Sequence, residues 1–378
     1  MSALSYLEKL LDGVEVEWKT LGSIAELKRG TSITKKDVID GTIPVVAGGR
    51  TPAYYHNTSN RDGQTIVIAG SGAYAGFVSW WEEPIFVSDA FTVKPHNILL
   101  PRYCYHFLMN MQQQLHEFKS GGGVPHVYPR DVSPILIPIP CPDTPEKSLA
   151  IQSEIVRILD KFTALTAELT AELNMRKKQY NYYRDQLLSF KEGEVKWKTL
   201  GEITEINTGQ KPSEILDKAA TFDYINAGTS RSGYTTMSNC DGDTVTTPSR
   251  GQGGIGFVGY QKTPFWLGPL CYKIKSLNNE ILINKFLFYT LQSRNRILLS
   301  LKKEGGVPAV NKIDLAKLII PLPSLDEQKR IVSLLDKFDT LTNSITEGLP
   351  REIELRQKQY EYYRDLLFSF PKPETVSN

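Results

Sequence analysis

The chain repeats itself, and this internal repeat constrains its fold more than any other feature. The heptapeptide Val-Glu-Trp-Lys-Thr-Leu-Gly at 16–22 recurs with one change at 195–201, an offset of 179 residues. A second motif, Lys-Gln-Tyr-x-Tyr-Tyr-Arg-Asp, begins at Lys178 and again at Lys358, an offset of 180. A repeat of this length is the size of a domain with a connecting segment. We therefore expect the 378 residues to form two similar halves in tandem.

The two copies are not equally alike along their length. Residues 16–140 and 195–323 share landmarks such as Gly-Phe-Val and Gly-Val-Pro but little else, whereas 146–190 and 324–370 are close copies. This pattern is expected if the two similar segments bind the same partner while the two divergent segments bind different targets. Divergence without functional selection would look similar, but we favour the functional interpretation.

The close copies are typical of long helices. Apolar residues recur every three or four positions through 151–187, and an equivalent stripe runs through 331–367. A helix of about 45 residues would be roughly 65–70 Å long and needs a packing partner, which the other copy supplies. Pro350 lacks a backbone donor, so the second helix should kink or break at Gly348-Leu349-Pro350.

The first of these helices contains a direct four-residue repeat. Its members are Thr166, Ala167, Glu168 and Leu169, followed by Thr170, Ala171, Glu172 and Leu173. Each unit adds about 6 Å to a helix and keeps leucine on nearly the same face, so units can be added or lost with little disturbance to packing. The repeat therefore predicts an adjustable spacer. Slippage in a coding repeat that the helix tolerates is compatible with this interpretation.

The predicted fold class is α+β: two mixed α/β domains separated by two long antiparallel, coiled-coil-like helices with pseudo-twofold symmetry. Short β-branched runs such as 65–69 and 243–247 are expected strands, and 99–119 and 284–301 are expected amphipathic helices. The expected domains are an N-terminal segment that completes the helix end (1–15), a first target domain (16–145), a central helix (146–192), a second target domain (193–323), and a C-terminal helix with a tail (324–378).

Composition excludes few classes of binding partner. The chain has 44 Lys+Arg and 42 Asp+Glu, which argues against a strongly basic nucleic-acid coat. Counting charges by segment, 16–140 has 11 basic and 10 acidic residues, and 195–323 has 16 and 10, so only the second domain is appreciably basic. Four cysteines without a Cys-x-x-Cys pair support neither a disulfide framework nor a zinc knuckle. We expect a cytoplasmic protein with no membrane partner.

Motifs of catalysis are missing from the sequence. It has no phosphate-binding loop, and the glycines of 70–76 miss the spacing of a dinucleotide-binding loop. The five histidines lack metal-ligand spacing. We therefore expect a non-catalytic chain that binds no cofactor or metal. Two other classes stay open: an autonomous enzyme acting on nucleic acid, which would turn over substrate alone, and a protein-binding scaffold or adaptor that is not specific for DNA.

The loops of the variable domains are rich in side chains that suit base edges and phosphates. Any one such residue is more often a plain solvated group, and only the clustering in glycine-bounded loops favours nucleic acid. The candidate DNA-binding residues are Lys35, Lys36, Arg50, Tyr54, Tyr55, His56, Arg61, His126, Tyr128 and Arg130 in the first domain, and Lys211, Arg231, Ser249, Arg250, Gln252, Asn311 and Lys312 in the second.

Taken together, the duplicated motifs and the Thr-Ala-Glu-Leu repeat resemble the DNA specificity subunit of type I restriction-modification enzymes, in particular the type IC branch. The resemblance covers essentially the whole chain. It implies two target recognition domains on double-stranded DNA, with the helices binding two modification subunits. Motor-nuclease subunits would complete the restriction enzyme. S-adenosylmethionine, ATP and Mg²⁺ would then belong to those partners.

That resemblance also implies a way of reading DNA. Each domain would bind one part of an asymmetric bipartite site, and the helices would set the distance between the two parts. Half-sites about 10 bp apart lie on one face of DNA, so half-sites of about 4 bp would leave roughly 6 unread base pairs. Because phosphate contacts supply most nonspecific affinity, a chain with a net charge of +2 should bind DNA weakly on its own.

Overall fold

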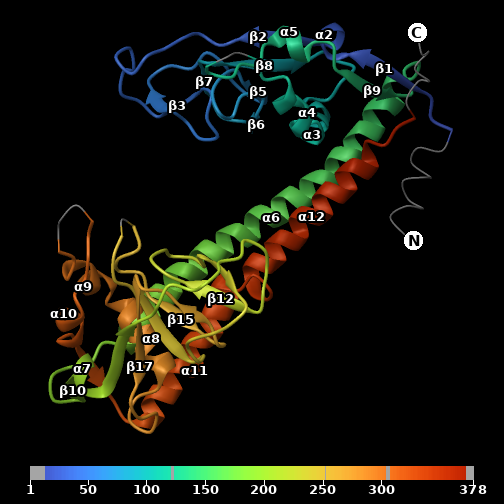
Figure 1. Ribbon diagram of the computed structural model, residues 1–378. Coiled ribbons are helices and arrows are strands. Elements are labelled where there is room, and N and C mark those ends of the chain that lie inside the picture. Colours follow the sequence, from blue (N-terminus) through green and yellow to red (C-terminus); the bar gives the residue numbers. More distant parts are fainter. Residues whose placement is uncertain (1–12, 121–122, 252, 304–306, 372–378) are drawn as a thin grey trace. The chain divides into compact units, whose positions relative to one another are not determined.

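The computed structural model describes residues 13–120, 123–251, 253–303 and 307–371. The chain divides into two compact units, one formed by Met1–Leu169 with Ile353–Asn378 and the other by Thr170–Glu352. Each unit contains one variable domain and parts of the long helices (Figure 1). The boundary between the units falls within the first long helix, so the domain limits expected above remain a prediction.

The variable domain of the first unit is built from three small sheets. Strands β1 and β9 form an antiparallel pair, the order β2-β8-β5-β6 makes a four-stranded antiparallel sheet, and β4-β3-β7 makes a three-stranded sheet. Central strand β5 is buried along its whole length, as its run of apolar β-branched residues predicts. The strands are β1 (Val16–Thr20), β2 (Ala25–Arg29), β3 (Ile43–Val46), β4 (Tyr54–His56), β5 (Thr65–Ala69), β6 (Val78–Trp81), β7 (Phe86–Val87), β8 (Ala90–Pro95) and β9 (Leu136–Pro140).

The second unit repeats this topology on a different sequence. Its pairs and sheets are β10-β18, β11-β17-β14-β15 and β13-β12-β16, which match those of the first unit strand for strand. The strands are β10 (Lys196–Thr199), β11 (Thr204–Thr208), β12 (Phe222–Ile225), β13 (Gly233–Thr235), β14 (Thr244–Pro248), β15 (Gly259–Gln261), β16 (Trp266–Leu267), β17 (Cys271–Ser276) and β18 (Ile319–Leu322). The duplication seen in the sequence is therefore a duplication of architecture.

Short helices cover the sheets at equivalent places in the two units. They are α2 (Leu21–Ile24), α3 (Pro101–Asn110), α4 (Gln112–Glu117) and α5 (Pro129–Val132) in the first, and α7 (Leu200–Ile203), α8 (Asn284–Ser293), α9 (Asn295–Ser300) and α10 (Lys312–Ala316) in the second. The single helix expected at 99–119 is two helices, because the chain turns at Met111, and the one expected at 284–301 breaks at Arg294.

The long helices are α6 (Pro145–Leu187), α11 (Leu325–Asn343) and α12 (Gly348–Leu367). The expected interruption of the second stripe is confirmed: α11 ends at Asn343, and α12 begins at Gly348, whose φ of +78° suits glycine. Pro350 lies in the first turn of α12, where no backbone donor is required. In the first unit α6 leaves the domain while α12 returns to it, so the two run in opposite directions there (Figure 1).

Candidate nucleic-acid interface

Three loops of the first domain meet at His126. Its backbone forms β-bridges with both Ser71 and Ser120, and the flanking hydrogen bonds are Gly72 N–H to Pro125 O at 2.9 Å and Val127 N–H to Gly70 O at 3.0 Å. A third segment also approaches, because a side chain at Gly48 would collide with the carbonyl of Ser71. Loops 47–53 and 70–77 therefore lie against Ser120 and residues 123–130, although these segments are far apart in sequence.

The second domain builds the same junction from different residues. Ala309 forms β-bridges with both Arg250 and Lys303. The flanking hydrogen bonds recur as Gly251 N–H to Pro308 O at 3.0 Å and Val310 N–H to Ser249 O at 2.9 Å. The two junctions thus share a main-chain framework, while His126 in one corresponds to Ala309 in the other.

Aromatic and guanidinium groups stack at the first junction. The rings of His126 and Tyr128 lie 5.7 Å apart at an interplanar angle of 12°. Arg29 and Arg130 both approach the Tyr128 ring, with their Cζ atoms 5.3 and 4.7 Å from its centroid. Arg29, His126 and Tyr128 line an open cavity of about 480 Å³. Such a combination of ring faces and planar donors suits nucleic-acid bases.

Nearby, Arg50 joins the loop at 47–53 to the one at 70–77. Its Cζ lies 4.8 Å from the Tyr74 ring centroid and 5.5 Å from that of Phe77. Both Arg50 and Tyr74 are exposed. Of the other expected residues in this domain, Lys35, Lys36 and Tyr55 are exposed and Tyr54 is half-buried.

In the second domain two of the exposed candidates pair with polar side chains. Lys312 donates to Asn207 Oδ1 at 2.9 Å, and Arg231 pairs with Asp223 at 3.0 Å. The exposed candidates are Lys211, Arg231, Arg250, Asn311 and Lys312. Gln252 lies outside the described residues.

In three of the expected residues the side chain is buried or bonded to groups within the domain. His56 is buried and accepts a hydrogen bond from the Ile39 N–H at 3.1 Å. The Arg61 guanidinium donates to main-chain oxygens of Asn60 and Arg29, at 2.7 and 3.0 Å, and so ties strands together. Ser249 is buried at the junction. Residue type alone could not separate these structural groups from surface groups.

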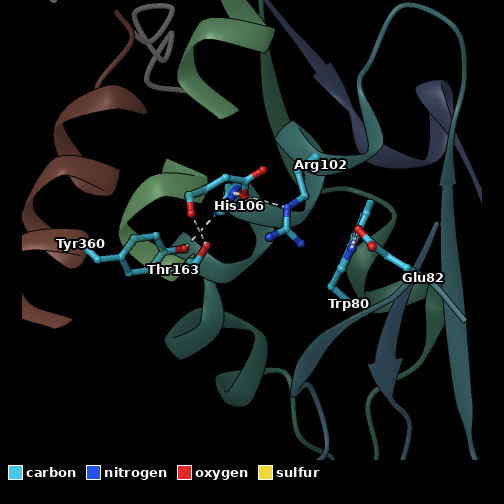
Figure 2. A network of polar contacts seen from close by, with 7 residues as sticks. Trp80, Glu82, Arg102, His106, Thr163 and Tyr360 are labelled. Atoms are coloured by element: carbon cyan, nitrogen blue, oxygen red, sulfur yellow. Dashed lines mark hydrogen bonds and ion pairs between the residues drawn. The ribbon is translucent and has the colours of Figure 1, made fainter. Parts of the chain in front are cut away.

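A polar network joins the first domain to the long helices (Figure 2). On α3, Arg102 and His106 both bond to Oδ1 of Asp160 on α6, at 2.8 and 2.7 Å. The other ring nitrogen of His106 lies 3.0 Å from the Tyr360 hydroxyl on α12. Arg102 also packs 4.8 Å from the Trp80 ring. One histidine thus connects the domain with both helices.

The buried His106 ring is neutral in this network. A carboxylate can only accept, so Nε2 donates to Asp160 and Nδ1 accepts from the Tyr360 hydroxyl. Burial lowers the pKa of His106 below its ordinary value, although the hydrogen bond to Asp160 acts in the opposite direction. For Asp160, partial burial would raise the pKa, but hydrogen bonds from His106 and Arg102 outweigh it and lower the pKa.

The second unit has a related network without histidine. The Tyr289 hydroxyl on α8 donates to Asp336 Oδ1 on α11 at 2.5 Å, and Lys285 lies 3.6 Å from the same oxygen. Tyr180 on α6 donates to Gln292 at 3.0 Å. Burial and the Asp336 carboxylate raise the pKa of Tyr289, so this hydroxyl stays protonated.

A fully buried glutamine anchors α6 to the first domain, and another anchors α11 to the second. Gln152 accepts from the Leu100 N–H at 2.8 Å and donates to the Ile98 carbonyl at 3.0 Å. In the second unit Gln328 makes the same bonds, to the Ile283 N–H and the Ile281 carbonyl, both at 2.9 Å. Sequence reasoning missed this pair, although both glutamines lie in the close copies.

The Thr-Ala-Glu-Leu repeat lies entirely within α6. Its Leu169 and Leu173 are half-buried, and Glu172 pairs with Arg176 at 2.6 Å, one helical turn on. Among the described residues, no cluster of three or more histidine, cysteine or acidic side chains is placed to hold a metal ion. Within the same residues, no helix has both the length and the apolar character to cross a bilayer.

Known proteins resemble this chain along its whole length. The family model of the type I restriction modification DNA specificity domain matches twice, at residues 13–176 and 192–355. The specificity subunit of the type I restriction enzyme EcoR124I/EcoR124II from Escherichia coli is 44% identical, over 100% of both chains. The EcoprrI specificity subunit from the same organism is 37% identical, over 92% of this chain and 93% of the other.

A solved structure supports the fold. The type I restriction-modification system S subunit from M. genitalium superposes with a TM-score of 0.67 and covers 96% of this chain and 98% of its own, at 20% identity. At that identity the likeness concerns the fold alone, and it agrees with a subunit of two repeated domains and long helices.

Proposed function

This chain belongs to the type I restriction-modification DNA specificity family, and we propose that it binds an asymmetric bipartite site in double-stranded DNA, with one recognition domain on each half-site. As a specificity subunit it is neither the methylase nor the nuclease of its complex. The chemistry would be done by modification and motor-nuclease subunits, and S-adenosylmethionine, ATP and Mg²⁺ would be bound there.

One observation supports this proposal above all: the two domains share a main-chain junction but differ in the side chains they place on it. Where the first has Ser71 and His126, the second has Arg250 and Ala309. A common framework with exchanged side chains is what two readers of different sequences require, because base identity is read by side-chain donors, acceptors and ring faces. The half-sites should accordingly differ.

The repeated helices support two copies of the same partner. Each copy of the Lys-Gln-Tyr-x-Tyr-Tyr-Arg-Asp motif presents a pair of tyrosines whose rings lie 5.4 Å apart, Tyr182 with Tyr183 in one unit and Tyr362 with Tyr363 in the other. Tyr182 and Tyr362 are well exposed. Exposed aromatic groups are common at protein interfaces, so we infer that two modification subunits dock on the helices.

The test is a map of methylated sites in cells that carry this chain with its modification subunits. We expect one bipartite motif with unlike halves and a fixed unread spacer. Exchanging residues 16–140 for those of a relative should change one half of the motif and leave the other intact. Methylation without a shared motif, or a motif that survives the exchange unchanged, would contradict the proposal and favour a scaffold that is not specific for DNA.

A further inference from the structure

Two charged side chains that were not among the candidates from the sequence line the cavity beside the first junction. Arg29, the last residue of β2, and Asp89, just before β8, both line it, and both side chains are exposed. Building on the function proposed above, we propose that Arg29 and Asp89 together read one G·C base pair of the first half-site through the major groove.

The Arg29 side chain is positioned so that its guanidinium could contact guanine. Its guanidinium lies 5.3 Å from the centroid of the Tyr128 ring, and that ring is itself supported by stacking on His126. Stacking occupies the flat face of a guanidinium and leaves the donors on its edge available. Two parallel N–H donors match the O6 and N7 acceptors of guanine, the commonest specific contact in the major groove.

Asp89 supplies the complementary chemistry. The Ser71 hydroxyl donates to Oδ2 of Asp89, which fixes the carboxylate and leaves Oδ1 as an acceptor. A carboxylate on a DNA-facing surface repels phosphates, so it lowers affinity unless it accepts a hydrogen bond from a base. The N4 amino group of cytosine is the base donor that aspartate reads in the major groove. An arginine and an aspartate beside one cavity thus match the two bases of one pair.

The second domain has no such pair at the equivalent positions. Strand registers place Arg29 opposite Phe91 and Thr208 opposite Tyr272, so Thr208 stands where Arg29 does. The carbonyl of Asp89 accepts from Gly70 N–H at 3.1 Å, and that of Leu270 accepts from Ser249 N–H at 2.9 Å, so Leu270 corresponds to Asp89. Threonine and leucine cannot reproduce this readout. The pair therefore distinguishes the two half-sites.

The experiment uses the full chain assembled with its modification subunits, acting on a DNA library randomised over both half-sites. Wild type should require G·C at one position of the first half-site. In Arg29→Ala that preference should fall roughly ten- to a hundredfold, the range for loss of a bidentate base contact. The second half-site and the spacer should not change.

Asp89→Asn tests the role of the carboxylate with a side chain of nearly the same size and shape. The asparagine oxygen can still accept from Ser71, but its amide now offers donors where the carboxylate accepted. Discrimination should relax at the same base pair as in Arg29→Ala. A merely structural Asp89 would leave the sequence preference of this variant unchanged.

Arg130→Ala is the matched control. Arg130 lies 4.7 Å from the same Tyr128 ring, but its side chain is 79% exposed and does not line the cavity. We expect it to contact phosphate, so its loss should weaken methylation evenly across sequences. Where Arg29→Ala fails to assemble, Arg29→Lys, which keeps the charge but loses the fork, provides the same readout.

The outcomes separate this inference from the function it rests on. A wild-type complex with no bipartite preference would overturn the proposed function. A bipartite preference that lacks a required G·C pair in the first half-site would overturn only the role of Arg29 and Asp89. The same holds if the two variants weaken all sites evenly, or relax different positions.

Discussion

His106 on α3 and Tyr289 on α8 occupy equivalent positions in the two units, and each bonds to an aspartate of a long helix, at 2.7 Å to Asp160 and 2.5 Å to Asp336. The same joint is thus built with a titratable imidazole in one unit and with a phenol in the other. Burial and the Asp336 carboxylate raise the pKa of the phenol above its already high ordinary value, whereas burial lowers the pKa of the imidazole, so of these two groups only His106 can take up a proton as the pH falls below neutral.

The first prediction concerns pH. Because the pKa of folded His106 lies below its ordinary value of 6.5, the unfolded chain binds the extra proton first as pH falls. Its contribution to stability is therefore complete above about pH 6.5 and is lost progressively below that. In His106→Gln, whose amide can still donate to Asp160, the thermal midpoint of the first unit should fall less between pH 7 and pH 5.5 than in wild type.

His96→Gln is the control for that measurement, since it makes the same change at an exposed histidine that takes no part in the network of His106, Asp160 and Tyr360. Its midpoint should follow wild type at both pH values. An equal fall in wild type and His106→Gln would show that the joint does not sense pH.

The second prediction concerns the buried glutamines. Gln152→Ala would leave the Leu100 N–H and the Ile98 carbonyl without their partner, at a cost of about 1–3 kcal/mol, since both groups are only partly buried. Hydrogen exchange should accelerate around α3 and not around α8, whereas Gln328→Ala should do the reverse. Gln186→Ala, at an exposed position of α6, should leave both regions protected. Equal loss in both units would contradict separate anchoring.

The third prediction concerns the spacer repeat. Inserting one more Thr-Ala-Glu-Leu unit after Leu173 lengthens α6 by about 6 Å, so the preferred unread spacer should grow by roughly one or two base pairs. Both half-sites should stay the same, because the recognition loops are untouched. Thr170→Ala with Glu172→Ala, at constant length, should keep the wild-type spacer. Methylation maps for wild type, the insertion variant and the double variant provide the test. An unchanged spacer after insertion would show that the repeat does not set the spacer length.

The fourth prediction concerns affinity. With a net charge of +2 and a nearly neutral first domain, the isolated chain has little net positive charge to attract it to phosphates. We expect its binding to the specific site at physiological salt to be at least roughly tenfold weaker than that of the complex with modification subunits, since linked contacts add avidity. Titrations by fluorescence anisotropy would show this. Equal, sequence-specific affinity of chain and complex would overturn it.

Much of this protein could be predicted from sequence because its main signals are local or repeated. The period of about 180 residues, the apolar stripe of α6 and an interruption of the second stripe near Pro350 could be predicted from spacing, since a helix has a fixed periodicity and proline lacks a backbone donor. The structure places that interruption just before Gly348, between α11 and α12. The resemblance to specificity subunits, carried by the duplicated motifs, agrees with the family match over both halves.

Only the tertiary structure decided which side chains share a site. Ser71, Ser120 and His126 meet because main-chain bridges join loops that are far apart in sequence, and no local pattern encodes those bridges. Composition made Arg61 a candidate for DNA contact, and only the structure shows that its guanidinium donates to the main chain of Arg29. Composition did not single out Arg29, for which we propose a role in base reading and whose place beside Tyr128 depends on another loop. A side chain's role depends on what packs against it, and that packing is set by long-range contacts.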